Sequence, residues 1–363
     1  MTKKIKLFDV SVDDKEKKIL EKIIDSKFWA SGSGTGFVKK FENQFKKYTK
    51  SKSCIAVNSG TAALHLALSQ FDIKNKEVII PSLSFVSTAN SVLYNGGIPV
   101  FADIDPKTLC IDPNDVKKKI SKKTKVIIPV HFAGMPAELA LLSKIAKIRK
   151  LVIIEDAAHA AGSSYKGKMI GGHGDACCFS FHPVKNLAMP SGGLISLNHK
   201  NHKLFSSELT AKRWCGITNR KATDYDIKDI GWNYYMNEFS AGIGLIQLSK
   251  LTKLNNTRKK IAKIYSSKLS ISEKMNYDQN CSYHFYWILV NNRDDLRKKL
   301  FEHNIETGIH YKPIHKFSFY SKNSQKLPVT EYVGKKIISL PCHPNLSSTD
   351  INKIIKLVNQ YAE

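Results

Sequence analysis

Three segments of the sequence contain residues that could act together in catalysis. Gly60 and Thr61 stand between an apolar run and a helical pattern, where the unpaired N–H groups of a helix start can hold a phosphate. Asp156 lies just after the apolar residues 151–154, and Lys185 follows a second strand-like segment at 176–181. A phosphate cradle, an acid at a strand end and a lysine are, in this order, the three contacts that pyridoxal phosphate (PLP) requires.

Each of these residues has an ordinary explanation when it is considered alone. A Ser-Gly-Thr sequence often only caps a helix. An aspartate at a strand end can be a cap or a metal ligand, and a lysine in a lysine-rich chain is most often a surface residue. The combination favours the PLP interpretation, in which the acid pairs with the protonated ring nitrogen and makes the ring an electron sink.

The elements that position these residues alternate between strands and helices. From residue 54 to about 200, short apolar runs (54–57, 78–80, 99–102, 126–130 and 151–154) alternate with helical patterns (61–68, 87–94, 114–120 and 137–148). Apolar runs of this kind predict a largely parallel sheet that is covered by helices on both faces. Functional residues of such a sheet are expected at the carboxyl ends of its strands.

The pattern changes after residue 230. A long helical pattern covers 237–269, and a strand-like segment follows at 283–290, with helices near 294–303 and 350–361. We therefore expect an α/β protein with two domains, a large PLP-binding domain over residues 1–250 and a smaller α+β domain over 251–363.

The charge of the chain does not by itself decide the class of function. The net charge of +26 raises the possibility of nucleic-acid binding, but only six of the 57 basic residues are Arg, and the lysines are spread through the chain. We interpret the charge as a solvated lysine surface that also favours an acidic substrate, and we expect no nucleic-acid partner.

The remaining bulk features indicate a cytoplasmic protein. No apolar run reaches the length of roughly 18 residues that a membrane span needs, so we expect no membrane association. The N-terminal residues are charged and lead into further charges, which is not the pattern of a secretory signal. The seven cysteines include no C-x-x-C pair, which favours reduced thiols and no metal site.

Ten motifs in order resemble the nucleotide-sugar aminotransferase family (the DegT/StrS group) among the type I, aspartate-aminotransferase-like PLP enzymes. The resemblance covers nearly the whole chain and implies the type I PLP-transferase fold. The motifs are WASGSGTGF (29–37), NSGTAAL (58–64), PSLSFVST (81–88), FADID (101–105), HFAG (131–134), EDAAH (155–159), SFHPVK (180–185), GWNYYMNE (231–238), HYKPIH (310–315) and LPCHP (340–344).

The resemblance implies a role for several residues around the cofactor phosphate. Gly60, Thr61 and Ser180 would hold the phosphate of PLP. Asn233 would reach the same phosphate from the neighbouring subunit, so the resemblance implies a homodimer with shared active sites.

The resemblance also implies roles around the cofactor ring. Phe85 would stack on the pyridine ring, Asp156 would pair with the ring nitrogen, and His159 would pack near the ring or its 3-oxygen. Lys185 would form the Schiff base with the cofactor and then move the proton between substrate and cofactor.

The function implied by the resemblance is transamination. An amino donor, expected to be glutamate, gives its amine to PLP, and the amine passes to a keto-sugar on a nucleotide diphosphate for amino-sugar and polysaccharide biosynthesis. Lys212, Arg213 and Arg220 are candidates for contact with the pyrophosphate, and His310 and Tyr311 for contact with the sugar.

Two departures from the family pattern bear on this function. The acidic Gly-Glu-Gly-Gly turn that often follows the lysine is replaced by Met189-Pro190-Ser191-Gly192-Gly193, so the loop on the substrate side is open to question. A dehydratase branch of the family has histidine in place of the lysine, and the lysine here favours transamination. A PLP-dependent sugar dehydratase and a non-enzymatic regulatory protein on the same fold remain the alternatives.

Overall fold

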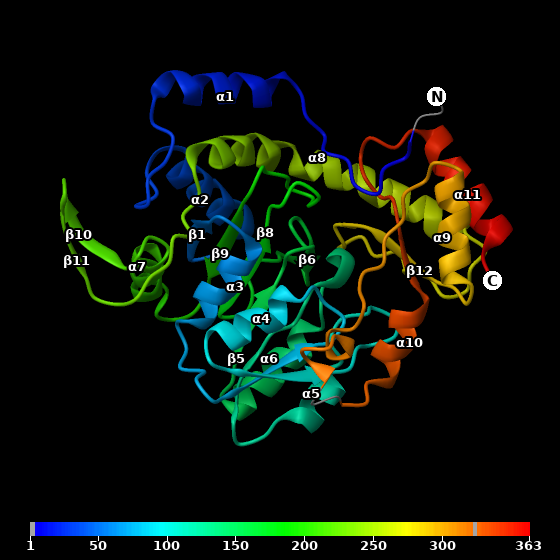
Figure 1. Cartoon of the computed structure of the whole chain (residues 1–363), viewed down its shortest axis with the longest axis horizontal. Coiled ribbons are helices and arrows are strands. Elements are labelled where there is room, and N and C mark those ends of the chain that lie inside the picture. Colours follow the sequence, from blue (N-terminus) through cyan, green and yellow to red (C-terminus); the bar gives the residue numbers. More distant parts are fainter. Residues whose placement is uncertain (1–3, 322–324) are drawn as a thin grey trace.

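A seven-stranded sheet forms the centre of the molecule in the computed structural model, which describes residues 4–321 and 325–363 (Figure 1). The strands lie in the order β1-β9-β8-β5-β4-β2-β3, and only β9 runs antiparallel to its neighbours. The predicted α/β fold with a mostly parallel sheet is therefore confirmed. The strands are β1 (Ser53–Val57), β2 (Glu77–Pro81), β3 (Ile98–Ala102), β4 (Thr124–Ile127), β5 (Val152–Asp156), β8 (Ala176–Ser180) and β9 (Gly193–Leu197).

Helices cover the sheet because most of its strand residues are buried and apolar on both faces. The helices of this part are α1 (Asp14–Ser26), α2 (Gly36–Thr49), α3 (Gly60–Leu68), α4 (Ser87–Tyr94), α5 (Pro113–Lys119), α6 (Leu139–Arg149) and α7 (His202–Lys212). A short hairpin, β6 (Ser164–Tyr165) and β7 (Lys168–Met169), and a 3-10 turn, η1 (Phe132–Gly134), complete it.

The long helix α8 (Glu238–Lys268) packs on α1 and α2 and then extends to the C-terminal part of the chain (Figure 1). It begins at Asn237, whose side chain accepts a hydrogen bond from the amide of Ser240 as an N-cap. The domain boundary that we predict at residue 250 falls inside this continuous helix, and it stays a prediction.

The C-terminal part is built on a second, two-stranded antiparallel sheet. Its elements are β12 (Tyr286–Leu289), α9 (Arg293–Glu302), η2 (Ile314–Lys316), α10 (Pro328–Lys336), β13 (Ile337–Leu340) and α11 (Ser348–Tyr361). One buried hydrophobic cluster contains both Ile127 of the large sheet and Ile338 of the small one. The two parts are therefore packed together by a shared core, which fixes the groove between them.

Two further features concern the surface. The hairpin of β10 (Ile217–Lys221) and β11 (Asp224–Ile227) projects from the body of the molecule at the left of Figure 1. Within residues 4–321 and 325–363, no helix is long and apolar enough to cross a membrane.

Candidate active site

A cavity of about 400 Å³ opens where β5 and β8 end and α3 begins. Residues of the C-terminal part close its other side. Nine of the residues predicted from the sequence line this one cavity: Gly60, Thr61, Phe85, Asp156, His159, Ser180, Lys185, His310 and Tyr311. Segments far apart in the chain thus meet at the carboxyl ends of parallel strands, where the sheet topology predicts a site.

Asp156 is the last residue of β5 and is only 4% exposed. The hydroxyl of Thr88 donates to its Oδ2 at 2.8 Å, and the amide of Ala158 donates to its Oδ1 at 3.1 Å. Burial raises the pKa of the Asp156 carboxyl, while these hydrogen bonds and the charge of Lys185 act in the opposite direction. The result is an oriented buried carboxylate that a cationic group in the cavity would stabilise further.

Lys185 follows β8 in a turn that its own amide closes by donating to the carbonyl of His182 at 2.8 Å. Burial lowers the pKa of the Lys185 amine to about 8, against the opposing effect of Asp156. An amine with this pKa is partly neutral near pH 7, and only a neutral amine can act as a nucleophile or accept a proton.

The start of α3 packs closely against the end of β8 at the edge of the cavity. Ser59 caps the helix by accepting from the amide of Ala62 at 3.1 Å, so the helix begins at Gly60. A Cβ atom on Gly60 would lie 2.7 Å from the Cβ of Ser180, so only glycine permits this close approach. The first amides of a helix have no acceptor within it, and together with the Ser180 hydroxyl they suit a phosphate.

Phe85 and His159 offer contacts for a planar ring. Phe85 is a large apolar side chain that is nevertheless 57% exposed, and its ring borders the cavity 6.1 Å from that of Tyr311. The Nε2 atom of His159 lies 3.1 Å from the Tyr311 hydroxyl, and its buried Nδ1 atom has no partner within the described residues. Burial, then the charges of Lys185 and His310, keep the pKa of His159 well below its usual value, so its ring is neutral.

These observations test whether PLP suits the cavity. A free aromatic face, a buried carboxylate, a reactive amine, a helix start and an unpaired histidine nitrogen meet in one place. They match the ring, the ring nitrogen, the aldehyde, the phosphate and the 3-oxygen of PLP in chemical type. The residues present fit the cofactor.

The structure does not bring Arg213 to the cavity. Arg213 is only 1% exposed, and its Nη1 atom donates to Glu42 at 2.6 Å and to the carbonyl of Ala56 at 2.8 Å. Its neighbour Lys212 forms an ion pair of 2.9 Å with Asp229. The expectation that Arg213 contacts substrate is therefore corrected, because its guanidinium is committed to a buried ion pair.

Arg220 and Asn233 also lie outside the cavity lining of their own chain. Arg220 is exposed on the β10–β11 hairpin, with its guanidinium 4.6 Å from the ring centre of Trp214. The Asn233 side chain is exposed, and its carbonyl accepts a hydrogen bond from Asn58 at 3.3 Å. Both side chains are available to a second molecule.

Sequence reasoning assigned no role to three residues of this region. Thr88 lies within the PSLSFVST motif, which was the available signal for it. Phe8 and His284 line the cavity but come from parts of the chain that only tertiary packing brings together.

The loop at 189–193, which departs from the family pattern, contributes one residue to the core and another to the cavity lining. Met189 is only 2% exposed and packs against Gly192 and against Gly244 of α8. Ser191 lines the cavity, so this loop brings a neutral hydroxyl to it.

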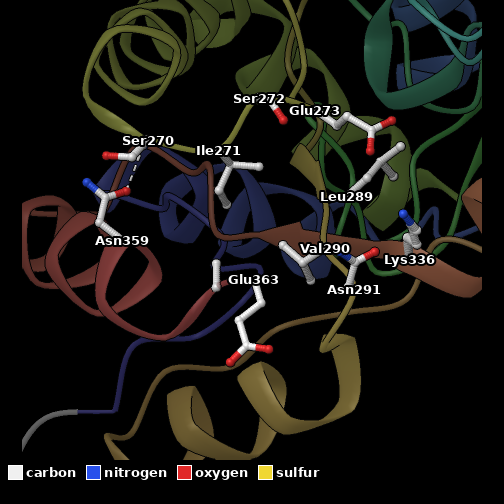
Figure 2. A pocket seen from close by; sticks show the side chains of 11 residues that line it. Ser270, Ile271, Ser272, Glu273, Leu289, Val290, Asn291, Lys336, Asn359 and Glu363 are labelled. Carbon is white, nitrogen blue, oxygen red and sulfur yellow. Dashed lines mark hydrogen bonds between the residues drawn. The ribbon is translucent and has the colours of Figure 1, made fainter.

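A second hollow of about 250 Å³ lies in the C-terminal part, between β12 and the end of α11 (Figure 2). The amide of Ser270 donates to Asn359 there at 2.9 Å. Glu273 accepts from Tyr332, and Lys336 donates to the same hydroxyl. Asn359, Glu273 and Lys336 thus have hydrogen-bond partners within the chain, and the hollow is lined by none of the predicted residues.

Comparison with known proteins agrees with this geometry. The model of the DegT/DnrJ/EryC1/StrS aminotransferase family matches residues 10–359. The chain is 34% identical to GDP-perosamine synthase of Escherichia coli O157:H7, over 99% of both chains.

Solved structures of aminotransferases also match the chain over nearly its whole length. The chain superposes on the apo-form of the putative sugar aminotransferase Spr1654 of Streptococcus pneumoniae with a TM-score of 0.94, at 26% identity over 99% and 97% of the two chains. A PLP-form of that protein matches with a TM-score of 0.92 at 26% identity over 99% and 98%. Helicobacter pylori PseC, an aminotransferase involved in the biosynthesis of pseudoaminic acid, matches with a TM-score of 0.92 at 28% identity over 99% of both chains.

Proposed function

Because the chain belongs to the DegT/DnrJ/EryC1/StrS aminotransferase family, we propose that it aminates a keto-sugar carried on a nucleotide diphosphate. The chain is a PLP-dependent sugar aminotransferase of amino-sugar biosynthesis. We further propose that the keto-sugar is linked to a nucleotide and that glutamate is the amino donor. The observation that carries it is the single cavity that Lys185, Asp156 and the start of α3 line together.

The proposal gives each cavity residue a task. The amides at Gly60 and Thr61 and the hydroxyl of Ser180 bind the phosphate. Phe85 orients the pyridine ring by contact with its face. PLP, when bound, supplies a carbonyl that exchanges for an amine and a ring that accepts electrons from the substrate carbon.

Two side chains then hold or transfer protons. The Asp156 carboxylate, oriented by Thr88 and Ala158, holds the proton on the ring nitrogen of the cofactor. The Nζ atom of Lys185 first binds the cofactor and then, as a free amine, moves the proton at the substrate carbon. Its lowered pKa of about 8 suits a base that works near neutral pH.

A homodimer is part of the proposal. Trp29, Ile227 and Ile230 are 52%, 55% and 76% exposed, although large apolar side chains of this kind are usually covered. Asn233 is exposed and outside the cavity of its own chain. An interface over this surface would cover the apolar side chains and let Asn233 act on the partner's cofactor phosphate.

The test combines cofactor binding with turnover. The purified protein should carry a visible absorption band from PLP that borohydride abolishes, and it should aminate at least one member of a panel of nucleotide-linked 3-keto and 4-keto sugars with glutamate. Lys185→Ala should abolish turnover. Near-normal turnover in this variant would remove the assignment of Lys185.

A further inference from the structure

Three aromatic rings are stacked along the side of the cavity that faces the C-terminal part. Phe8 lies parallel to His284, with ring centres 4.9 Å apart and planes 16° apart. His284 in turn stacks on His159 at 4.6 Å and 30°. All three rings line the cavity, so the stack runs from the predicted cofactor side to the N-terminal segment.

The N-terminal segment holds Phe8 in place by contacts on both sides of it. Ile5 forms a β-bridge with Ile305, and the amide of Leu7 donates to Glu306 at 3.1 Å. Further along, Asn345 donates to Asp9 at 2.9 Å. Phe8 is therefore a fixed part of the cavity wall, although it stands near the start of the chain.

Two other histidines on this side, His159 and His310, have a hydroxyl beside one ring nitrogen, although Nδ1 of His159, like that of His284, has no partner among the described residues. Nε2 of His159 lies beside the hydroxyl of Tyr311, and Nδ1 of His310 lies 2.8 Å from the hydroxyl of Ser339. His284 is only 3% exposed, and its buried Nδ1 atom has no hydrogen-bond partner in the part of the chain that the structure describes. A buried polar nitrogen without a partner is unfavourable, and a ligand in the adjoining cavity could relieve this.

The chemistry of the pair favours a sugar over the amino donor. Burial, then the charges of Lys185 and His159, keep the pKa of His284 well below its usual value, so its ring is neutral. A neutral imidazole and a phenyl ring have no charge with which to hold the carboxylates of an amino acid. A pyranose offers apolar C–H faces to an aromatic ring and neutral hydroxyls to an imidazole.

We propose that Phe8 and His284 bind the sugar ring of the acceptor, Phe8 by packing against its C–H face and His284 by a hydrogen bond to one of its hydroxyls. This assignment rests on the proposed function and adds two specificity residues to it. Neither residue is assigned to the cofactor, although His284 stacks on His159, so their main effect is expected in the half-reaction that uses the sugar.

The two half-reactions can be measured separately on the holoenzyme. Glutamate alone converts the PLP form to the amine form, which removes the visible band. The isolated amine form is then mixed with GDP-, UDP- and dTDP-linked keto-sugars, and the return of the band is followed. Phe8→Ala and His284→Phe are compared with Phe8→Tyr, which keeps the ring, and with Phe301→Ala, which removes an exposed phenylalanine from α9.

We expect weaker use of the sugar in the second half-reaction and an unchanged first half-reaction with glutamate. Phe8→Ala and His284→Phe should each raise the sugar concentration for half-maximal rate roughly tenfold, while their glutamate step and both steps of Phe301→Ala stay within about twofold of wild type. Phe8→Tyr keeps the aromatic face and should lose less than Phe8→Ala. Equal losses in both steps, or no loss with the sugar, would overturn the assignment. If wild-type protein reacts with glutamate but with no keto-sugar, the proposed function itself fails.

Discussion

The hydroxyl of Thr88 in the first turn of α4 donates a hydrogen bond of 2.8 Å to Oδ2 of Asp156 at the end of β5. Thr88 is fully buried, and its Oγ1 also lies 2.8 Å from the hydroxyl of Ser84. The amide of Ala158 supports the other carboxylate oxygen. Asp156 is thereby fixed in direction, and the two hydrogen bonds lower its pKa against the larger effect of burial, which raises it.

Thr88→Val should reduce turnover roughly tenfold or more, since a hydrogen bond to a charged group contributes about 1.5–3 kcal/mol. Loss of the hydroxyl raises the pKa of Asp156 further, so the acidic limb of the pH–rate profile should move to higher pH. Thr88→Ser keeps the hydroxyl and is the matched control. A Val variant as active as the Ser variant, with an unmoved acidic limb, would show that this hydrogen bond is not needed.

Asp156→Asn should be far more damaging than Thr88→Val. The substitution keeps the shape of the side chain but removes the charge that holds a proton on the ring nitrogen. We expect a loss on the order of a thousandfold or more in kcat, with PLP still bound. The measurement is kcat together with the absorption band of the holoenzyme. A loss below about tenfold would make Asp156 a structural residue.

Much of the fold could be predicted from apolar periodicity. The helix expected at 87–94 coincides with α4 (Ser87–Tyr94), and the helix expected at 237–269 differs from α8 (Glu238–Lys268) by one residue at each end. The ends of the strands were predicted less accurately. The strand expected at 126–130 is β4 (Thr124–Ile127), since Pro129 has no N–H group to donate to a neighbouring strand.

The parts of the site that were missed depend on tertiary packing. Arg213 looked like an anion-binding residue because a sequence does not reveal that Glu42, far away in the chain, meets it in the core. Phe8 and His284 carry no local signal, because their stacking arises only when the N-terminal segment packs on the C-terminal part. The order of motifs identified the strand ends, and packing determined which other side chains meet there.

The amine of Lys185 should titrate near pH 8 in protein freed of PLP, because burial lowers its pKa to about 8 from an ordinary value of 10.5. The reactive form is the neutral amine, so the rate of PLP attachment should rise with pH and level off above this midpoint. Asp156→Asn removes the charge that opposes the shift and should move the midpoint to lower pH. Lys185→Ala supplies the background from the other lysines. A midpoint near the ordinary value would contradict the burial argument.

Arg213→Met should destabilise the protein by about 3–5 kcal/mol, since it removes the buried partner of the Glu42 carboxylate and leaves it only the amide of Ala56 and a longer ion pair with the exposed Lys39. Urea unfolding of the PLP-free protein measures this change. Arg220→Met is the control, because Arg220 is exposed on the β10–β11 hairpin and should leave stability within about 0.5 kcal/mol. If Arg213→Met instead kept full stability and weakened only the binding of nucleotide-sugar, the ion pair would not be its main role.

Asn233 gives a test of shared active sites, because its side chain is exposed and lies outside the cavity of its own chain. Two variants are combined, Lys185→Ala and, at limiting PLP, Asn233→Ala, after each has been found strongly impaired alone. If Asn233 acts on the partner subunit, a mixed dimer has one site with both defects and one with neither. Half of the dimers are mixed after random exchange, so roughly a quarter of wild-type activity should return. If Asn233 acts within its own subunit, every site keeps a defect and mixing restores nothing. Exchange of subunits is verified with differently tagged chains, so an absence of rescue in exchanged dimers rejects the shared site and leaves the assignment of Lys185 unchanged.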